Sequence, residues 1–151
     1  MKINLVYISN SKKASHLETK IHKRLTSIIK VNLTRIPVKI QFKKKIDQCE
    51  YEAKLVAKKF DLSKPFFCFD KEGKKYTTEA FSKFLINLNS ESTFIIGGTY
   101  GISQSLKLKS SEIISLSDME FSHEVFRIMV LEQFYRVSCV INNHPFQQIE
   151  E

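Results

Sequence analysis

Three of the four glycines in this chain lie within one short segment, Phe94-Ile-Ile-Gly-Gly-Thr-Tyr-Gly101. An apolar run that stops at Gly97 and Gly98 is typical of a buried strand ending in a tight loop. Because glycine lacks a Cβ, a ligand or another stretch of backbone can approach such a loop closely. In α/β proteins, loops at the carboxyl ends of strands are the usual ligand sites. The spacing matches neither a Walker loop nor the dinucleotide fingerprint, so a ligand loop and a structural turn both remain open.

A second group of polar residues leads into the last apolar segment of the chain and continues along it. Ser122 is placed to cap a helix there, with an acidic residue in the favoured first turn. His123 and Arg127 are four residues apart and therefore share a helix face, as do Glu132 and Arg136. The spacing predicts an ion pair for Glu132 and Arg136. For His123 it leaves a structural and a functional role open.

These residues must be positioned by alternating strands and helices. Hydrophobic periodicity predicts both kinds of element, with a strand interrupted near Pro37 and a turn at 71–74. The alternation favours a mainly parallel sheet with helices on both faces, forming a single α/β domain over residues 1–151. The predicted strands are 2–9, 31–42, 65–70, 92–96 and 112–117, and the predicted helices are 14–30, 46–60, 77–89 and 122–141.

The last predicted helix is apolar around most of its circumference. A helix of this kind must be buried on nearly all sides. Two arrangements satisfy that demand: a central core helix, or a helix at the interface of a dimer. We favour the dimer, because the domain is small and the helix is its last element.

Charge and cysteine content limit the class of protein. Residues 1–60 contain 15 Lys and Arg against 4 Asp and Glu, within a chain of net charge +8. This asymmetry favours a polyanionic partner such as nucleic acid, whereas solvated helix faces are the alternative. The three cysteines are far apart and lack metal-ligand spacing, which predicts structural thiols in the reducing cytoplasm. No apolar stretch approaches the roughly 20 residues of a membrane span.

Taken in order, the motifs resemble a known family. They are Phe94–Ser103, Ser115-Leu-Ser-Asp-Met119 with His123, Arg127, Leu131-Glu-Gln-Phe-Tyr-Arg136 and Asn143-His-Pro145. Together they are similar to the small SPOUT-class methyltransferases that modify N3 of pseudouridine in 23S ribosomal RNA. The resemblance extends over the whole chain.

The resemblance implies a fold, a cofactor and partners. The fold is an α/β domain with a deep trefoil knot at its carboxyl end, an exception to the rule against threaded chains. The cofactor is S-adenosyl-L-methionine, no metal is needed, and the partners are a second copy of the chain and ribosomal RNA or the assembled ribosome. By position, the implied cofactor-binding residues are Phe69, Gly97, Leu116, Ser117, Asp118, Met119, Glu120 and Phe121. The implied active-site residues are His123, Arg127, Tyr135 and Arg136.

Two departures from the family pattern bear on activity. Glu120 stands where the family usually has threonine, and Phe146-Gln147 stands where it has tyrosine and histidine. Glutamine cannot titrate near neutral pH, so it cannot replace histidine in proton transfer. Two alternatives to an active ribosomal RNA methyltransferase follow. One is a cofactor-binding relative with lost or changed activity, and the other is a methyltransferase for another RNA.

Overall fold

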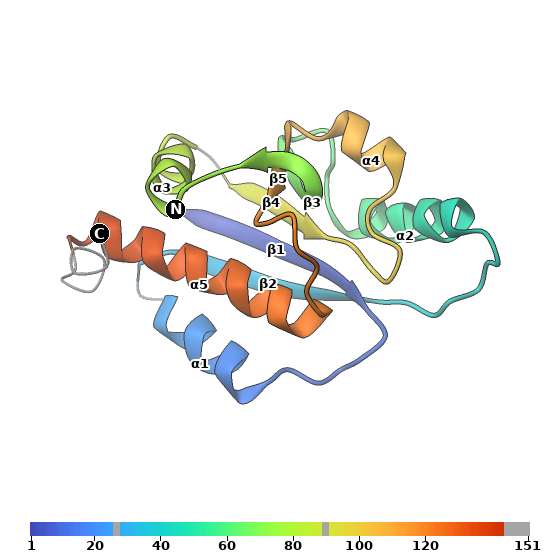
Figure 1. Ribbon diagram of the computed structural model, residues 1–151, viewed down its shortest axis with the longest axis horizontal. Helices are drawn as coiled ribbons and strands as arrows, with labels where there is room; N and C mark the ends of the chain where they lie inside the picture. The colour runs from blue at the N-terminus through green and yellow to red at the C-terminus, as the bar shows by residue number, and fades with distance from the viewer. Residues whose placement is uncertain (26–27, 89–90, 144–151) are drawn as a thin grey trace.

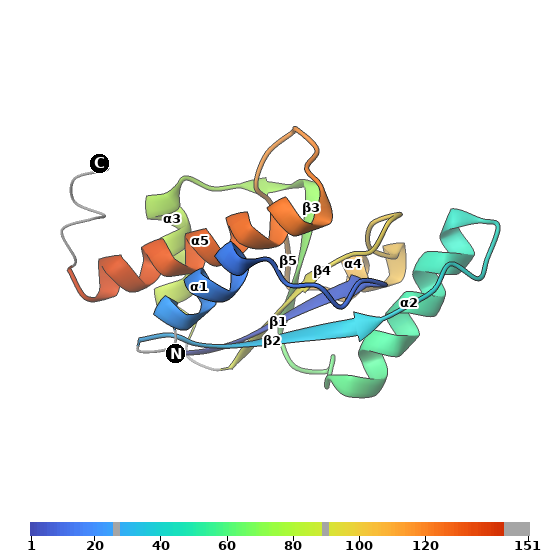
Figure 2. The same ribbon diagram turned by 90° about the horizontal axis from the view of Figure 1, so that it is seen from below.

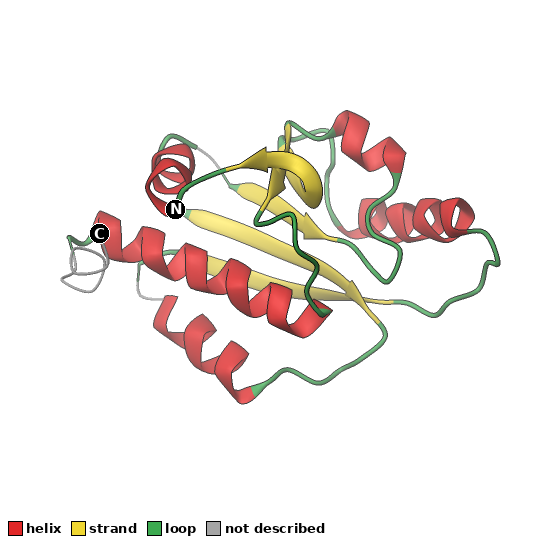
Figure 3. Ribbon diagram, viewed as in Figure 1, coloured by secondary structure: helices red, strands yellow, loops and turns green. Residues whose placement is uncertain are grey.

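The computed structural model describes residues 1–25, 28–88 and 91–143 of the chain. Five strands form one sheet in the order β2-β1-β4-β3-β5, and every neighbouring pair is parallel (Figures 1 and 3). The strands are β1 (Lys2–Ser9), β2 (Lys30–Pro37), β3 (Phe66–Lys75), β4 (Ser92–Ile96) and β5 (Glu112–Ser115). The helices are α1 (His16–Leu25), α2 (Lys45–Lys59), α3 (Thr78–Ile86), α4 (Gln104–Lys109) and α5 (His123–Ile141).

The central strands β1 and β4 are buried on both faces, as expected for a parallel sheet covered by helices. Alternate side chains of β1 point to opposite sides: Leu5 joins a cluster under α1, α3 and α5, whereas Val6 joins a cluster under α2 and α4. Phe94 and Ile95 divide in the same way on β4. Figure 2 shows α1 and α5 side by side on one face of the sheet. The α/β architecture with helices on both faces is therefore confirmed.

Several element boundaries follow local chemistry that the sequence displays. Thr77 caps α3 by accepting a hydrogen bond from the Ala80 amide, and Ser122 caps α5 by accepting one from the Val125 amide. Strand β4 has the predicted bounds. Strand β2 ends at Pro37, because proline supplies no amide hydrogen to continue the ladder. The predicted continuation of the first helix over residues 28–30 is wrong, since β2 begins at Lys30, and residues 26–27 lie outside the described residues. The predicted extension of β2 to residue 42 is also wrong.

The predicted turn at 71–74 is also wrong, because these residues continue β3. The register with β5 shifts between Phe69 and Lys74, so an irregular segment joins two paired stretches. Gly73 lies in this segment, where an added Cβ would be 2.6 Å from the carbonyl carbon of Ile113. The absence of a side chain lets the backbones meet, and β3 therefore extends beyond the point where periodicity ended it. Helix α4 was not predicted at all.

The apolar last helix, α5, packs between α1 and α3 across one face of the sheet. Val130, Leu131, Phe134 and Val137 are almost completely buried there. Its opposite side is only partly covered within the chain, and Val125 and Ile141 remain exposed. The helix is therefore a core helix with a further apolar side, and its place at a dimer interface stays a prediction.

Candidate functional site

A cavity of about 500 Å³ opens at the carboxyl edge of the sheet, and we call it the main cavity. This volume lies in the range of small-molecule sites. Three neighbouring strands supply its walls, since it is bordered by the end of the first stretch of β3, the loop after β4 and the segment after β5. Of the predicted cofactor and active-site residues, it gathers Phe69, Gly97, Leu116, Ser117, Met119, Glu120, Phe121 and His123.

The glycine loop after β4 is shaped by close backbone contacts. A Cβ on Gly97 would lie 2.5 Å from the carbonyl carbon of Gly101, so the loop cannot close with any larger residue there. The amide of Gly101 donates to the carbonyl of Gly98 over 3.0 Å, and Gly101 has a positive φ of 83°. The predicted tight turn is confirmed, and its close approach is backbone against backbone.

A buried carboxylate lies behind this loop, and the sequence analysis missed it. Glu52 of α2 is 2 % exposed, and a Cβ on Gly98 would be 2.8 Å from its Oε1 atom. Gln48 donates a hydrogen bond to Glu52 Oε2 over 2.8 Å, but Oε1 has no hydrogen-bond partner among the described residues. Burial raises the pKa of Glu52, although the Gln48 hydrogen bond and the charge of His123 oppose the shift. The available signal was a glutamate at an apolar-face position of α2, beside Ala53.

The loop after β5 is tied to the unexpected extension of β3. Lys71 donates to Glu120 over 2.9 Å, and Lys75 donates to Asp118. The Lys71 hydrogen bond lowers the pKa of the Glu120 carboxyl. Asp118 therefore holds the loop at the rim, where its side chain faces Lys75. Met119, which is 74 % exposed, stands at the mouth of the cavity.

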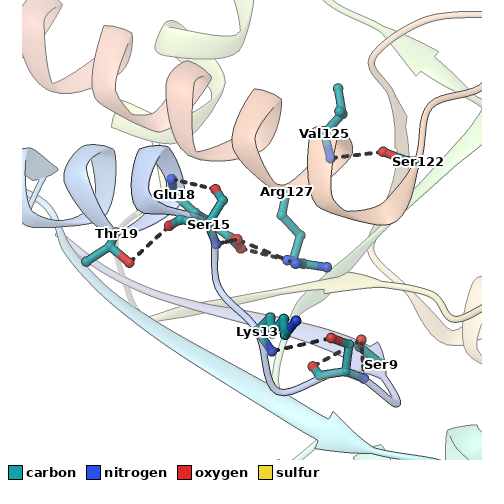
Figure 4. A network of polar contacts seen from close by, with 9 residues as sticks. Ser9, Lys13, Ser15, Glu18, Thr19, Ser122, Val125 and Arg127 are labelled. Carbon is teal, nitrogen blue, oxygen red and sulfur yellow. Dashed lines mark hydrogen bonds and ion pairs between the residues drawn. The ribbon is translucent and has the colours of Figure 1, made fainter.

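Arg127 lies in a second, smaller cavity of about 290 Å³ that we call the side groove. The groove is bounded by the loop after β1, the glycine loop and the first turn of α5, and His123 lines both cavities. Arg127 is itself buried, and its Nε donates to Glu18 Oε1 over 2.6 Å (Figure 4). Its guanidinium also lies over the Tyr7 ring, 4.5 Å from the centroid.

Glu18 also caps its own helix, and this double role was missed in the sequence. The Glu18 amide donates to Ser15 Oγ, while the Ser15 amide donates to Glu18 Oε2 (Figure 4). This is a capping box, and the Ser-x-x-Glu spacing was the signal for it. The second carboxylate oxygen remains available for Arg127, so the start of α1 is fixed against α5.

Tyr135 and Arg136 are not brought to the main cavity of their own chain. They lie 12 and 13 residues beyond His123, which is about 18 Å or more along a helix. Burial raises the pKa of Tyr135, with a smaller effect from its hydrogen bond to Cys139. Arg136 pairs with Glu132 over 3.3 Å, so the predicted ion pair is confirmed. The departures at Phe146 and Gln147 fall outside the described residues.

The three cysteines are free and buried, as predicted. Burial raises the pKa of Cys68 to about 12, which keeps this thiol protonated and unreactive. Among the residues that the structure describes, no cluster of three or more histidine, cysteine or carboxylate side chains is placed to hold a metal. In the same part of the chain, no helix is long and apolar enough to cross a membrane.

A parallel sheet with a glycine-lined cavity at its carboxyl edge is the arrangement typical of α/β proteins that bind small molecules. The family model described as predicted SPOUT methyltransferase matches residues 1–147, and the chain belongs to this family. Among curated relatives, a protein of Dictyoglomus thermophilum is 37% identical over 128 residues, covering 82% of this chain and 83% of the relative. A protein of Parabacteroides distasonis is 31% identical over 154 residues, covering 97% and 98%. Both are named ribosomal RNA large subunit methyltransferase H.

Solved structures support the fold. A probable methylase family protein from Haemophilus influenzae superposes with a TM-score of 0.57 at 12% identity, over 93% of this chain and 68% of that chain. A putative RNA methyltransferase from Bacillus anthracis gives a TM-score of 0.52 at 12% identity, over 90% and 94%. At these identities the likeness shows the shared architecture alone.

Proposed function

We propose that this protein transfers a methyl group from S-adenosyl-L-methionine to N3 of a pseudouridine in 23S ribosomal RNA of the large subunit. The observation that carries the proposal is the match to relatives named ribosomal RNA large subunit methyltransferases over nearly their whole length. The main cavity supports it as well, since it gathers most of the residues that the family resemblance assigns to the cofactor.

The residues around the main cavity fit this cofactor. Phe69, Leu116 and Phe121 provide apolar surface for the adenine, and the backbone of Gly97 can be approached closely because it has no side chain. Ser117, Met119 and Glu120 complete the wall, while Asp118 holds their loop through Lys75. When bound, the cofactor supplies an electrophilic methyl group on a sulfonium sulfur.

The reaction needs alignment and removal of a proton. The lone pair of N3 becomes available when its proton passes to a base, and N3 then forms a bond to the methyl carbon. The sulfur–carbon bond breaks at the same time, and its electron pair stays on sulfur. The protein contributes by holding N3 in line with that bond and by accepting the proton. His123 lines the same cavity as the proposed cofactor residues, which supports a role for it beside the transferred methyl group.

The other proposed active-site residues divide by position. Arg127 acts by positioning the first turn of α5, because its guanidinium is engaged with Glu18. Tyr135 and Arg136 are remote from their own main cavity, so in our proposal they serve the site of a second copy of the chain. This assignment makes the homodimer part of the catalytic unit.

The outward side of α5 supports the homodimer. An outer groove of about 510 Å³ runs beside this helix, with Ile128 and Met129 on one wall and Leu17 on the other. Leu17 is 50 % exposed in the single chain.

Light scattering should give the mass of a dimer, and Leu17→Glu should yield monomers. The matched change Leu108→Glu, on the far face of the sheet, should leave the dimer intact. Monomeric wild-type protein would refute this part.

Three further features belong to the same proposal: a single domain, a cytoplasmic location and a carboxyl-terminal trefoil knot. The knot is supported by the path of the chain. Strand β5 lies at one edge of the sheet beyond β3, yet α5 packs against α1, so the chain crosses back over the sheet after β5.

Charge near the cavity supports an RNA substrate. Lys43, Lys44 and Lys45 precede or open α2, and Lys45 lies 5.4 Å from the centre of the Tyr100 ring at the cavity wall. Contacts of such lysines with phosphates release counterions and make affinity depend on salt.

The test is transfer of labelled methyl from S-adenosyl-L-methionine to ribosomes that lack the modification, with transfer RNA as the comparison substrate. Transfer to the ribosome at a pseudouridine N3 is expected. Cofactor binding by calorimetry without transfer to any RNA would favour the altered relative, and transfer to transfer RNA alone would favour another substrate. If only the double variant Phe146→Tyr with Gln147→His is active, the altered tail accounts for the loss.

A further inference from the structure

The side groove and the main cavity meet at the same residues. Gly98, Thr99 and His123 line both, so a molecule in one cavity reaches the boundary of the other. A methyl transfer requires the acceptor atom to touch the methyl carbon, with no protein atom between them. The side groove therefore has the location that an acceptor needs if the main cavity holds the methyl donor.

The composition of the side groove suits a nucleobase. Ile8, Val38 and Ile40 form an apolar wall, and Ile40 is 49 % exposed in the single chain. Asn10 at the rim carries a side-chain amide, which offers a donor and an acceptor together. Enzymes that modify a base in RNA or DNA hold it outside the stack, between apolar surfaces and hydrogen-bonding groups.

The charges of the side groove favour a neutral base over a phosphate inside it. Arg127 is neutralised by Glu18 within hydrogen-bond distance. Of the other charged lining residues, Lys13 and Glu124 carry opposite signs. The groove itself has little net charge, whereas the exposed side chain of Lys13 can reach a phosphate outside it.

The loop after β1 is held in place before any ligand binds. The Ser11 amide donates to Ser9 Oγ over 3.1 Å, and the Lys13 amide donates to Ser11 Oγ over 3.3 Å (Figure 4). Arg35 donates to the Ser9 carbonyl over 2.7 Å. These bonds fix the rim that carries Asn10, so less ordering is needed on binding.

The opposite apolar wall is fixed by a buried glutamine. Gln48 is fully buried, donates to the Lys39 carbonyl over 3.0 Å and accepts from the Gln41 amide over 2.9 Å. These two bonds straddle Ile40 and anchor the irregular segment that carries it. Both walls of the groove are therefore preorganised by polar contacts beneath the surface.

We infer that the side groove receives the uracil-type base of the target nucleoside, turned out of its RNA strand, while Asn10 reads its polar edge and Ile40 covers its face. The inference rests on the proposed function, since it supplies the acceptor for the same reaction. It adds a recognition site formed by the loop after β1 and the segment after β2, both outside the motifs that carry the family resemblance.

The test compares two groove variants with a matched control. Asn10→Ala removes the amide, and Ile40→Glu puts a carboxylate on the apolar wall. Leu108→Glu makes the same kind of change at an exposed leucine of α4, which lines none of the cavities described above. Methyl transfer to ribosomes lacking the modification, ribosome binding by sedimentation and cofactor affinity by calorimetry are measured for each.

Both groove variants should bind the cofactor with wild-type affinity. Their kcat/KM for the ribosome should be lower than that of the wild type, by about tenfold or more for Ile40→Glu. Leu108→Glu should keep wild-type values. Wild-type kcat/KM in both groove variants would overturn the inference and leave the proposed function standing. A wild-type protein that binds ribosomes without methylating them, with binding lost in the groove variants, would support the groove alone. A wild type that neither binds nor methylates ribosomes would overturn both.

Discussion

Two buried carboxylates lie on opposite faces of the sheet, close to the same site, and their surroundings differ. Glu18, 1 % exposed, accepts hydrogen bonds from the Arg127 guanidinium and the Ser15 amide. Glu52, 2 % exposed, accepts one hydrogen bond from the neutral Gln48 amide and leaves Oε1 without a partner among the described residues. A buried charge is costly unless it is paired, so Glu18 joins two helices whereas Glu52 is held at a cost. The difference indicates that the α1 side of the site is stabilised by the paired Glu18. On the α2 side, the desolvation of Glu52, directly behind the glycine loop, is only partly compensated.

The largest change in the free energy of unfolding should appear when Arg127, the cation paired with Glu18, is replaced. Arg127→Leu leaves Glu18 buried and unpaired, which should lower the free energy of unfolding by about 3–5 kcal/mol. Urea denaturation at one fixed protein concentration measures this. Arg127→Leu combined with Glu18→Gln removes both charges and keeps the cap at Ser15, and should recover most of the loss. Equal destabilisation of the single and double variants would show that packing, not charge pairing, joins α1 to α5.

The next largest loss of stability should come from filling the space between Gly98 and Glu52. Gly98→Ala places a Cβ 2.8 Å from Glu52 Oε1 and 3.2 Å from Ile8 Cγ2, so these side chains must shift. The expected loss of stability is about 1–3 kcal/mol, as for other overpacked sites. In a double-mutant cycle with Glu52→Ala, the clash with the carboxylate disappears, and the alanine at 98 should cost less than it does alone. Additive effects would show that Glu52 does not restrict this position.

A smaller effect should depend on pH. Because burial raises the pKa of Glu52 in the folded protein, the folded state favours the protonated carboxyl. The wild type therefore loses stability as pH rises from the unfolded carboxyl pKa through the raised folded value. Glu52→Gln cannot ionise, so its unfolding free energy should match the wild type at acidic pH and exceed it by about 1 kcal/mol at pH 8. A difference in unfolding free energy between wild type and Glu52→Gln that does not change with pH would argue against the raised pKa of Glu52.

The smallest effect is expected at an exposed carboxylate of the same site. Glu120 pairs with Lys71 in full contact with solvent, where water and salt screen the interaction. Glu120→Gln should leave the urea unfolding curve unchanged. Its effect should be confined to cofactor affinity, measured by calorimetry at low and high salt. A clear loss of stability would mean that this loop is part of the folded core.

The sequence predicted the parts of the fold that depend on local patterns. Strand β4 and the cap at Ser122 were predicted correctly, because apolar runs and hydroxyl caps act over a few residues. The extension of β3 was missed, since Gly73 serves a contact with Ile113 that lies far away in the chain. The short helix α4 has too few residues for a periodic signal.

The candidate site, like the fold, was predicted where local sequence motifs define it and missed where distant contacts define it. The glycine loop and the segment from Leu116 to Phe121 were found from composition and resemblance, and the structure brings them to one cavity. Glu52 and Asn10 were not found, because their significance comes from three-dimensional neighbours that no spacing reveals. Arg127 was identified as a site residue, but its partner Glu18 is 109 residues away.

The strand order also has a consequence for how the chain folds. Strand β1 pairs with β4, whose residues lie about 90 positions later, and the Glu18–Arg127 contact spans 109 residues. Contacts of such long range must overcome the entropy of closing large loops, and proteins dominated by them fold slowly. During synthesis, α1 and β1 therefore emerge well before the segments that bury them. The early chain, rich in lysine, must remain soluble until α5 arrives, and its high positive charge helps to keep it so.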